Sequence, residues 1–159
     1  RPSRCGRSLS GAKQMSTWEA GQGVVELPDG RRIRGRGLRK NSLGSVEPEF
    51  GVYLLGRDPT IEGWPSRWVR WRDFRLPDST DEAVAALREA HQRAASERVE
   101  VACSGGIGRT GTGLAVLAVL SGVAPDDAVT WVREHFHPRA VETRGQRRWI
   151  AEAAASLSA

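Results

Sequence analysis

The chain has 159 residues, which is enough for one domain with a substantial core, whereas two independent domains of half that length would each be marginal. Hydrophobic residues make up 39% and charged residues 27%, a balance that is too apolar for a disordered chain. The longest apolar run, Leu114 to Leu120, is far shorter than the roughly 20 residues needed to cross a bilayer, so no membrane span is predicted.

The net charge of +5 is concentrated toward the N-terminus. Residues 1–40 hold ten Arg or Lys against three Asp or Glu, and the remainder holds 14 against 16. Such a stretch is typical of a solvated arm, with nucleic acid, an acidic protein or an anionic membrane as weaker alternatives for a partner. We expect residues 1–20 to be a poorly ordered basic tail, with a start near Met15, and residues 21–159 to form the domain.

The cysteines, Cys5 and Cys103, lie far apart and in different contexts, so the sequence does not predict a disulfide framework. The N-terminus has no continuous apolar segment of the signal-peptide kind. Both observations favour a reducing, cytoplasmic location.

The first elements in the chain are strands. Pro28-Asp29-Gly30 separates two short extended segments and predicts a small N-terminal hairpin, because Asp-Gly supplies the positive backbone dihedrals of a tight turn. Residues 50–55 indicate a buried strand, and residues 67–71 alternate with period two as a second strand does.

The second half is predominantly helical. Ser79 and Glu82 have the spacing of a capping box for a helix that ends near Ser96. A strand over 99–102 follows, and then a helix over 112–120 that is apolar on every side. The pattern next predicts a helix from Pro125 to about Phe136 and a last helix capped by Thr143 and Gln146. Interleaved strands and helices predict an α/β fold, a single domain with a central, largely parallel sheet flanked by helices.

The glycine-rich segment between that strand and the apolar helix carries the chemistry. Five residues separate Cys103 from Arg109, and the small residues among them let successive backbone N–H groups point inward as an anion-binding nest on a helix N-terminus. Arg109 has the planar donors to bind two phosphoryl oxygens in parallel. The same amides favour a thiolate on Cys103. The predicted phosphate-binding loop consists of Ser104, Gly105, Gly106, Ile107, Gly108 and Arg109.

This segment resembles the signature of the protein tyrosine phosphatase superfamily, Cys-x5-Arg followed by Ser or Thr. The resemblance implies hydrolysis of phosphotyrosine esters through a phosphocysteine on Cys103, with Arg109 holding the phosphate and Thr110 helping the thiolate to leave. It implies no cofactor and no metal. Phosphotyrosine proteins or peptides would be the substrates, and phosphate- or sulfate-type anions would bind in the loop. Strict tyrosine specificity and dual specificity both stay open.

The same resemblance implies an acid on a neighbouring loop. The segment from Trp71 to Pro77 is similar to the family's Trp-Pro-Asp loop, with arginine in place of its first proline, and Asp73 lies 30 residues before Cys103 (103 − 73). Pro77 sets the register, so Asp73 is the expected general acid. Asp78 is the alternative, and its competing role is a turn or cap before the next helix.

A third similar segment, residues 139–146, implies that Gln146 orients the water that attacks phosphocysteine. Its competing role is the helix cap already noted. The sequence departs from the family at Ala102, where most members carry a histidine that braces the loop. We expect this departure to make the thiolate form of Cys103 less stable and to slow turnover without abolishing it.

Other functions compete for the same residues. One alternative is a phosphate-binding module that has lost turnover, and another is a phosphatase of phosphoinositides or of RNA 5′-phosphates. Residues 106–111 also fit the G-x-G-x-x-G dinucleotide fingerprint, but residue 131, where that fingerprint wants an acid, is Trp. His91, His135 and His137 have no partners at metal-ligand spacing.

Overall fold

The computed structural model describes residues 17–40 and 46–158. Within them, one sheet has the strand order β1-β2-β5-β3-β4, with only β1 antiparallel to its neighbour. The predicted α/β domain with a largely parallel sheet and an N-terminal hairpin is therefore confirmed. The strands are β1 (Val24–Glu26), β2 (Arg32–Gly37), β3 (Phe50–Leu55), β4 (Ser66–Arg70) and β5 (Val99–Cys103).

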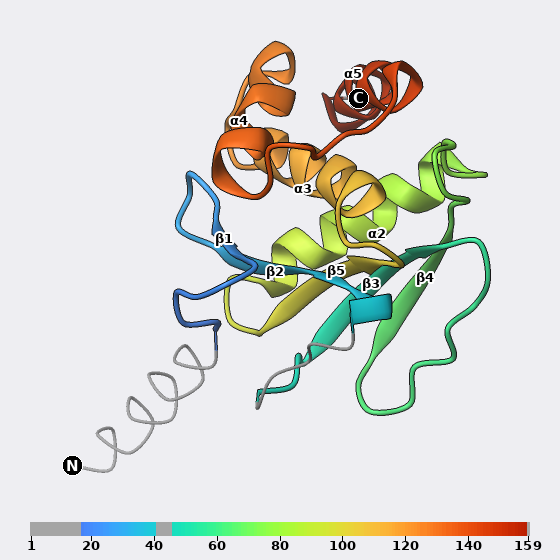
Figure 1. Cartoon of the computed structure of the whole chain (residues 1–159). Coiled ribbons are helices and arrows are strands. Elements are labelled where there is room, and N and C mark those ends of the chain that lie inside the picture. The colour runs from blue at the N-terminus through green and yellow to red at the C-terminus, as the bar shows by residue number, and fades with distance from the viewer. Residues whose placement is uncertain (1–16, 41–45, 159) are drawn as a thin grey trace.

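The α-helices lie on one face of this sheet (Figure 1). They are α2 (Thr80–Arg93), α3 (Gly108–Leu120), α4 (Ala128–His135) and α5 (Arg144–Ser158). Two 3-10 turns are η1 (Leu38–Lys40), directly after β2, and η2 (Pro125–Asp127), directly before α4. α2 and α3 pack on the strands, and α4 and α5 pack on α3. α3 is thus the central helix, and it extends directly from the loop after β5.

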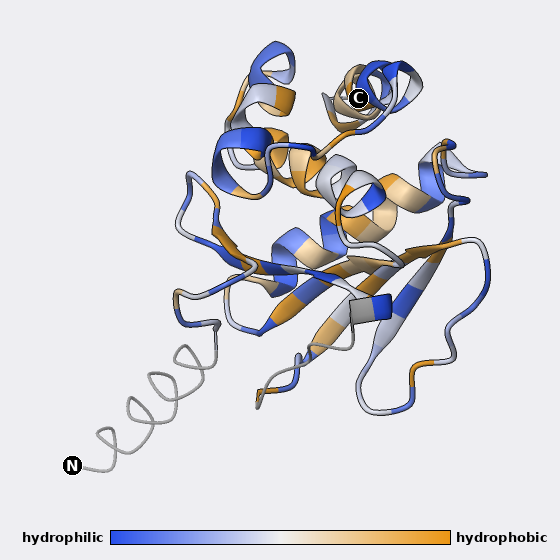
Figure 2. Ribbon diagram, in the orientation of Figure 1, coloured by the Kyte–Doolittle hydropathy of each residue, from blue (hydrophilic) through white to orange (hydrophobic). Residues whose placement is uncertain are grey.

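The core fills the space between the sheet and the helices, where apolar residues of both layers face each other (Figure 2). All residues of β3 and β5 are buried, as are those of α3 from Gly108 to Ala118. This burial confirms the prediction of a helix that is apolar on every side, and it fixes the start of α3 against the end of β5.

Two boundaries differ from the sequence-based expectation. α3 begins at Gly108 rather than at Thr112. Its first turn contains Gly108 and Gly111, which have low helix propensity, and it is stabilised by tertiary packing that the sequence pattern does not show. Of the expected tail, residues 1–20, the first 16 residues lie outside the described part of the chain. Trp18, in contrast, is 5% exposed, and its indole nitrogen donates to the Val99 carbonyl oxygen at 2.7 Å. The packed part of the chain therefore begins before residue 21.

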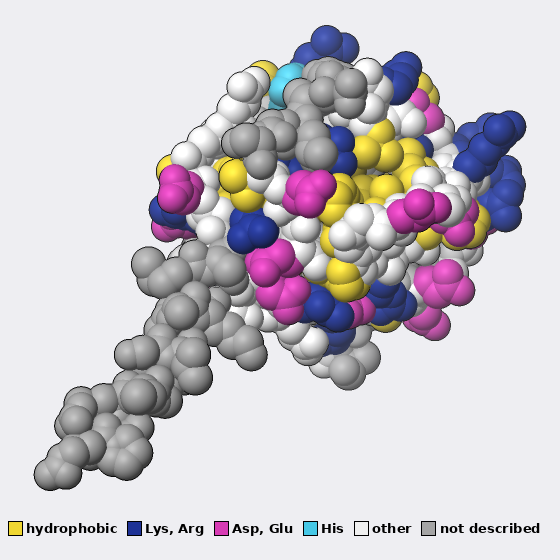
Figure 3. Space-filling view, turned by 90° about the horizontal axis from the view of Figure 1, so that it is seen from below, with side chains coloured by type: hydrophobic (Ala, Val, Ile, Leu, Met, Phe, Trp, Pro, Cys, Tyr) yellow, Lys and Arg dark blue, Asp and Glu magenta, His cyan; other side chains and the backbone are white. Residues whose placement is uncertain are grey.

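The other face of the sheet carries no helix among the described residues. Seen from that side, charged side chains surround a patch of apolar side chains (Figure 3). Trp68 of β4 is one of the exposed large apolar residues there, at 36%. Within residues 17–40 and 46–158, none of the helices has the length and apolar character of a membrane span.

Candidate active site

The loop after β5 folds around the sulfur of Cys103. This side chain is 2% exposed, and its Sγ accepts hydrogen bonds from the Gly106 N–H at 3.2 Å and from the Thr110 hydroxyl at 3.0 Å. Both donors stabilise negative charge on sulfur, and α3 points its N-terminus at the same place. Cys103 and Thr110, predicted as partners from the sequence, are therefore in direct contact.

The shape of the loop depends on glycine at two positions far apart in the sequence. Gly106 has a φ of 78°, which disfavours residues with a Cβ, and a Cβ there would lie 2.5 Å from the Gly37 nitrogen. A Cβ on Gly37 would in turn lie 2.6 Å from the Gly105 carbonyl oxygen. The end of β2 is thus packed backbone to backbone against the loop.

Arg109 lies beneath the loop with its side chain almost completely buried. Nη1 donates to the Trp71 carbonyl oxygen at 2.8 Å, and Nη2 lies 3.6 Å from a carboxylate oxygen of Asp73. Nε is buried and has no hydrogen-bond partner among the described residues. Because a buried guanidinium N–H without a partner is costly, this donor suits an anion bound in the loop.

The segment after β4 carries both acids that the sequence proposed, and it separates them. Asp73 faces Arg109 with its side chain 48% exposed. Asp78 lies 3.7 Å from Arg70 of β4, and its N–H donates to the Arg70 carbonyl oxygen at 3.0 Å. The geometry brings Asp73, and not Asp78, to the phosphate loop.

Gln146 occupies the helix cap that the sequence offered as its competing role. Its backbone N–H donates to Thr143 Oγ1 at 3.0 Å, and its Oε1 accepts from the N–H groups of Glu142 and Thr143 at 2.9 and 3.3 Å. Its Nε2 donates to the Arg75 carbonyl oxygen at 3.4 Å. The side chain therefore connects the start of α5 to the segment that carries Asp73.

Glu142 lies beside the phosphate loop, although the sequence analysis did not select it. A Cβ added to Gly108 would collide with its carboxylate. The preceding residue, Val141, has a φ of 65°, which is a strained value for a β-branched side chain. Arg133 holds this turn by donating to the carbonyl oxygens of Ala140 and Val141, each at 2.8 Å. The acid directly before the predicted Thr143 cap was the available sequence signal.

Comparison with known proteins identifies this arrangement. The family model described as protein-tyrosine phosphatase matches residues 55–153, which include the loop, Asp73 and Gln146. The chain belongs to this family. Membership confirms the resemblance seen in the sequence and establishes a phosphatase fold, while the roles of individual residues stay predictions.

Solved structures of tyrosine and dual-specificity phosphatases have the same fold. Tk-PTP in its active form has a TM-score of 0.63 at 24% identity, covering 82% of this chain and 96% of that one. Kinase associated phosphatase, with its catalytic cysteine replaced by serine, has a TM-score of 0.66 at 14% identity and covers 89% and 99%. DUSP15 has a TM-score of 0.64 at 15% identity and covers 87% and 91%.

Curated relatives come from the archaeon Methanocaldococcus jannaschii. The uncharacterized proteins MJ0215 and MJECL20 are each 34% identical over 88 residues, which is 55% of this chain. The match covers 54% of the first relative and 58% of the second. The chain thus spans about half the length of the curated relatives it matches.

Proposed function

We propose that this protein tyrosine phosphatase family member hydrolyses phosphotyrosine esters through a phosphocysteine intermediate on Cys103. The observation that carries the proposal is the convergence of two groups on one loop. At one end of the loop a sulfur accepts two hydrogen bonds, and at the other end a buried arginine has an Nε without a partner among the described residues. A phosphate dianion bound there would be held by the inward-facing amides and by Arg109.

In the first step the Cys103 thiolate attacks phosphorus, and the bond to the phenolic oxygen breaks. Asp73 donates its proton to that oxygen, a role supported by the 3.6 Å distance between its carboxylate and Nη2 of Arg109. In the second step water attacks phosphorus, Asp73 takes the proton, and the phosphorus–sulfur bond breaks. The Thr110 hydroxyl, 3.0 Å from Sγ, stabilises the departing thiolate.

Gln146 is proposed to orient the attacking water. For this role its side-chain amide must either leave the helix cap described above or bind the water while it keeps the cap hydrogen bonds. Its contact with the Arg75 carbonyl places the amide next to the acid segment, which supports a part in the second step.

Phe74 supports an aromatic substrate. It follows Asp73 directly, is 59% exposed and has a φ of 61°, so a large apolar ring is held in a strained conformation at the surface beside the acid. We expect the ring of an aryl ester bound in the loop to contact this side chain. Steady-state kinetics on matched phosphotyrosine and phosphothreonine peptides test the preference, and equal kcat/KM for both would replace it with dual specificity.

The choice between the two acids gives a direct test of the mechanism. Asp73→Asn should lower kcat on a phosphotyrosine peptide by about 10²–10⁴-fold, the usual contribution of a general acid. The loss should be smaller on p-nitrophenyl phosphate, whose leaving group needs less protonation. Asp78→Asn, a matched change five residues away (78 − 73) that removes a carboxylate paired with Arg70, should keep kcat within about twofold of the original. The reverse order of the two variants would show that the register is wrong.

A further inference from the structure

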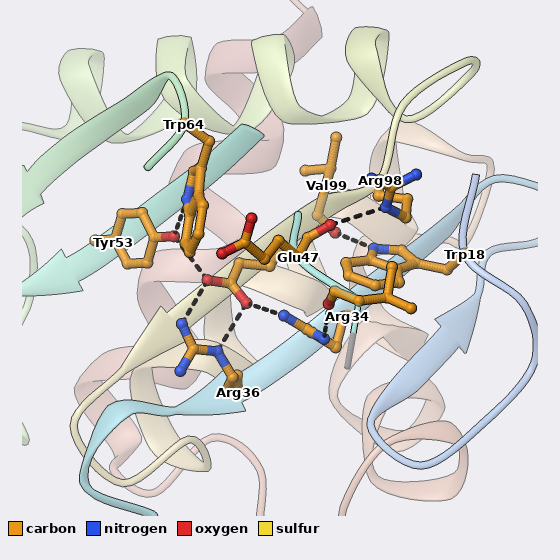
Figure 4. A network of polar contacts seen from close by, with 10 residues as sticks. Trp18, Arg34, Arg36, Glu47, Tyr53, Trp64, Arg98 and Val99 are labelled. Carbon is orange, nitrogen blue, oxygen red and sulfur yellow. Dashed lines mark hydrogen bonds and ion pairs between the residues drawn. The ribbon is translucent and has the colours of Figure 1, made fainter. Parts of the chain in front are cut away.

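Glu100 is the one fully buried carboxylate among the described residues, and it lies three residues before the nucleophile on the same strand. Arg36 binds it with two parallel hydrogen bonds of 2.8 Å, and Arg34 donates to it at 2.9 Å. The Tyr53 hydroxyl donates to it at 2.6 Å and accepts from the Trp64 indole at 2.7 Å. Figure 4 shows Arg34 and Arg36 from β2, Tyr53 from β3 and Trp64 from the loop before β4 pointing toward one another. We call Arg34, Arg36, Tyr53 and Glu100 the Glu100 cluster.

The protonation states in this cluster are set by its contacts. Burial by itself raises the pKa of Glu100, but the hydrogen bonds from Arg36, Tyr53 and Arg34 offset that effect and leave the pKa below its usual value. Burial and the neighbouring Glu100 charge raise the pKa of Tyr53. At neutral pH the cluster therefore holds one anion, two cations and a neutral phenol that donates.

The strand register places this cluster around Ala102, the residue next to Cys103. Ala102 is the parallel partner of Arg36 on β2 and of Tyr53 on β3. Paired residues present their side chains on the same face, so the methyl group of Ala102 lies between two long side chains that meet at Glu100. Val101 faces α3, which puts Glu100 and Ala102 on the side of the sheet away from the helices.

Packing alone does not account for these charges. Arg34 and Arg36 are 11% and 10% exposed and Glu100 is 0% exposed, so all three charges lose most of their hydration. Apolar residues of similar size would usually hold such a sheet face as well or better, because desolvation of a buried ion pair consumes most of its Coulomb energy. Two arginines bind one glutamate on the side of β5 away from the helices. Arg34 also donates to the Val46 carbonyl oxygen, and the Glu47 side chain lies beside the cluster (Figure 4), so we base the proposal on the charge of Arg36.

We propose that the Glu100 cluster positions the end of β5 and supplies, from behind the phosphate loop, the positive charge that supports the Cys103 thiolate and a bound phosphate. The cluster occupies the surroundings of residue 102, where Ala102 replaces the family's usual histidine. Arg36 is the principal positioning residue, because it is paired with Ala102 and makes two of the hydrogen bonds to Glu100. The inference rests on the proposed function only for the identity of the bound anion.

Other charged groups face the same loop and are part of the balance. Arg109 comes from α3, and Arg39 of η1 lies beside Gly105. Asp73 comes from the segment after β4, and Glu142 comes from the turn before α5. Arg36 acts on the sulfur in addition to these two cations and two carboxylates, so the effect of its removal is measured with these four groups unchanged.

The test is the pH dependence of Cys103 alkylation by iodoacetamide, measured in a Cys5→Ser background so that one thiol remains. Arg36→Met should move the midpoint of that profile to higher pH by about 0.5–1 unit, the size expected for the loss of one partly buried charge on the neighbouring strand. Arg34→Met removes the other guanidinium bound to Glu100 and should move the midpoint in the same direction. Arg88→Met is the matched control, because Arg88 lies on α2 and donates to the Leu157 carbonyl oxygen, and it should leave the midpoint in place.

Two further variants separate charge from bracing. Arg36→Lys keeps the charge and should keep the original midpoint, while kcat falls. Tyr53→Phe removes one hydrogen bond to Glu100 without a change of charge, so it should lower kcat and leave the midpoint in place. Folding is checked by thermal unfolding, and Arg36→Gln replaces Arg36→Met if the latter does not fold.

An unchanged midpoint in a folded Arg36→Met or Arg36→Gln variant overturns the inference, as does an equal shift in Arg88→Met. Alkylation needs no turnover. If the original chain alkylates as described but shows no phosphatase activity that depends on Cys103, the proposed function fails and the inference about the cluster stands.

Discussion

Cys103→Ser should reduce hydrolysis of p-nitrophenyl phosphate to the level of the buffer blank. The serine hydroxyl stays protonated at neutral pH and is a poor nucleophile, whereas the sulfur of Cys103 accepts hydrogen bonds from Gly106 and Thr110 that favour its anion. Release of p-nitrophenol, followed by absorbance at saturating substrate, measures the loss.

The control for this result is Cys5→Ser, which should keep full activity because it leaves the loop untouched. The Cys103→Ser protein should still bind inorganic phosphate, visible as a rise in the midpoint of thermal unfolding with phosphate concentration. Retention of more than about a hundredth of the activity would mean that another group performs the chemistry, which contradicts covalent catalysis on this cysteine. Full loss of activity in a protein that also loses phosphate binding would point to a collapsed loop instead.

Arg109→Lys should lower kcat/KM by about 10³-fold. Loss of one preorganised donor to a transition-state oxyanion costs about 10²–10³, and lysine cannot reproduce two parallel hydrogen bonds to phosphoryl oxygens. The change also removes the contact with the Trp71 carbonyl, which holds the segment that carries Asp73 over the loop. Both kcat and KM should therefore deteriorate, in contrast to the Asp73 variant, where the loss is mainly in kcat.

Steady-state kinetics of Arg109→Lys beside Arg88→Lys provide the comparison. Arg88 lies on α2 and donates to the Leu157 carbonyl oxygen at 2.9 Å, so the same change there should leave kcat/KM within about twofold. If Arg109→Lys kept more than about a tenth of the original kcat/KM, the bidentate phosphate contact would not be required, and the buried Nε would need another explanation.

The loop from Cys103 to Arg109 could be predicted from the sequence because its chemistry is local. A strand, small residues and an arginine at fixed spacing leave few alternatives for the backbone. Helix α3 shows where this approach stops. Its first turn contains Gly108 and Gly111, which have poor helix propensity but are needed there, because a Cβ at either position would collide with the turn before α5. Such contact between distant segments is not visible in a periodicity.

The Glu100 cluster illustrates the same limit more strongly. Within residues 99–102 an acid between two valines suggests a strand with one solvated face. Its actual partners Arg34 and Tyr53 are 66 and 47 positions away, and only the strand order β2-β5-β3 brings them together. Glu142 was overlooked for a related reason, since its place beside Gly108 depends on the strained backbone of Val141.

Gly37 lies outside every motif by which this family is recognised, yet its hydrogen atom occupies the place where any side chain would press on the carbonyl of Gly105. A random mutagenesis screen for inactive variants should therefore recover substitutions at this position, 66 residues upstream of the nucleophile (103 − 37), together with those in the signature itself. We therefore expect the effect of a substitution on activity to depend on how closely backbone segments pack at that position in the folded molecule, and not on its sequence distance from the Cys103–Arg109 loop.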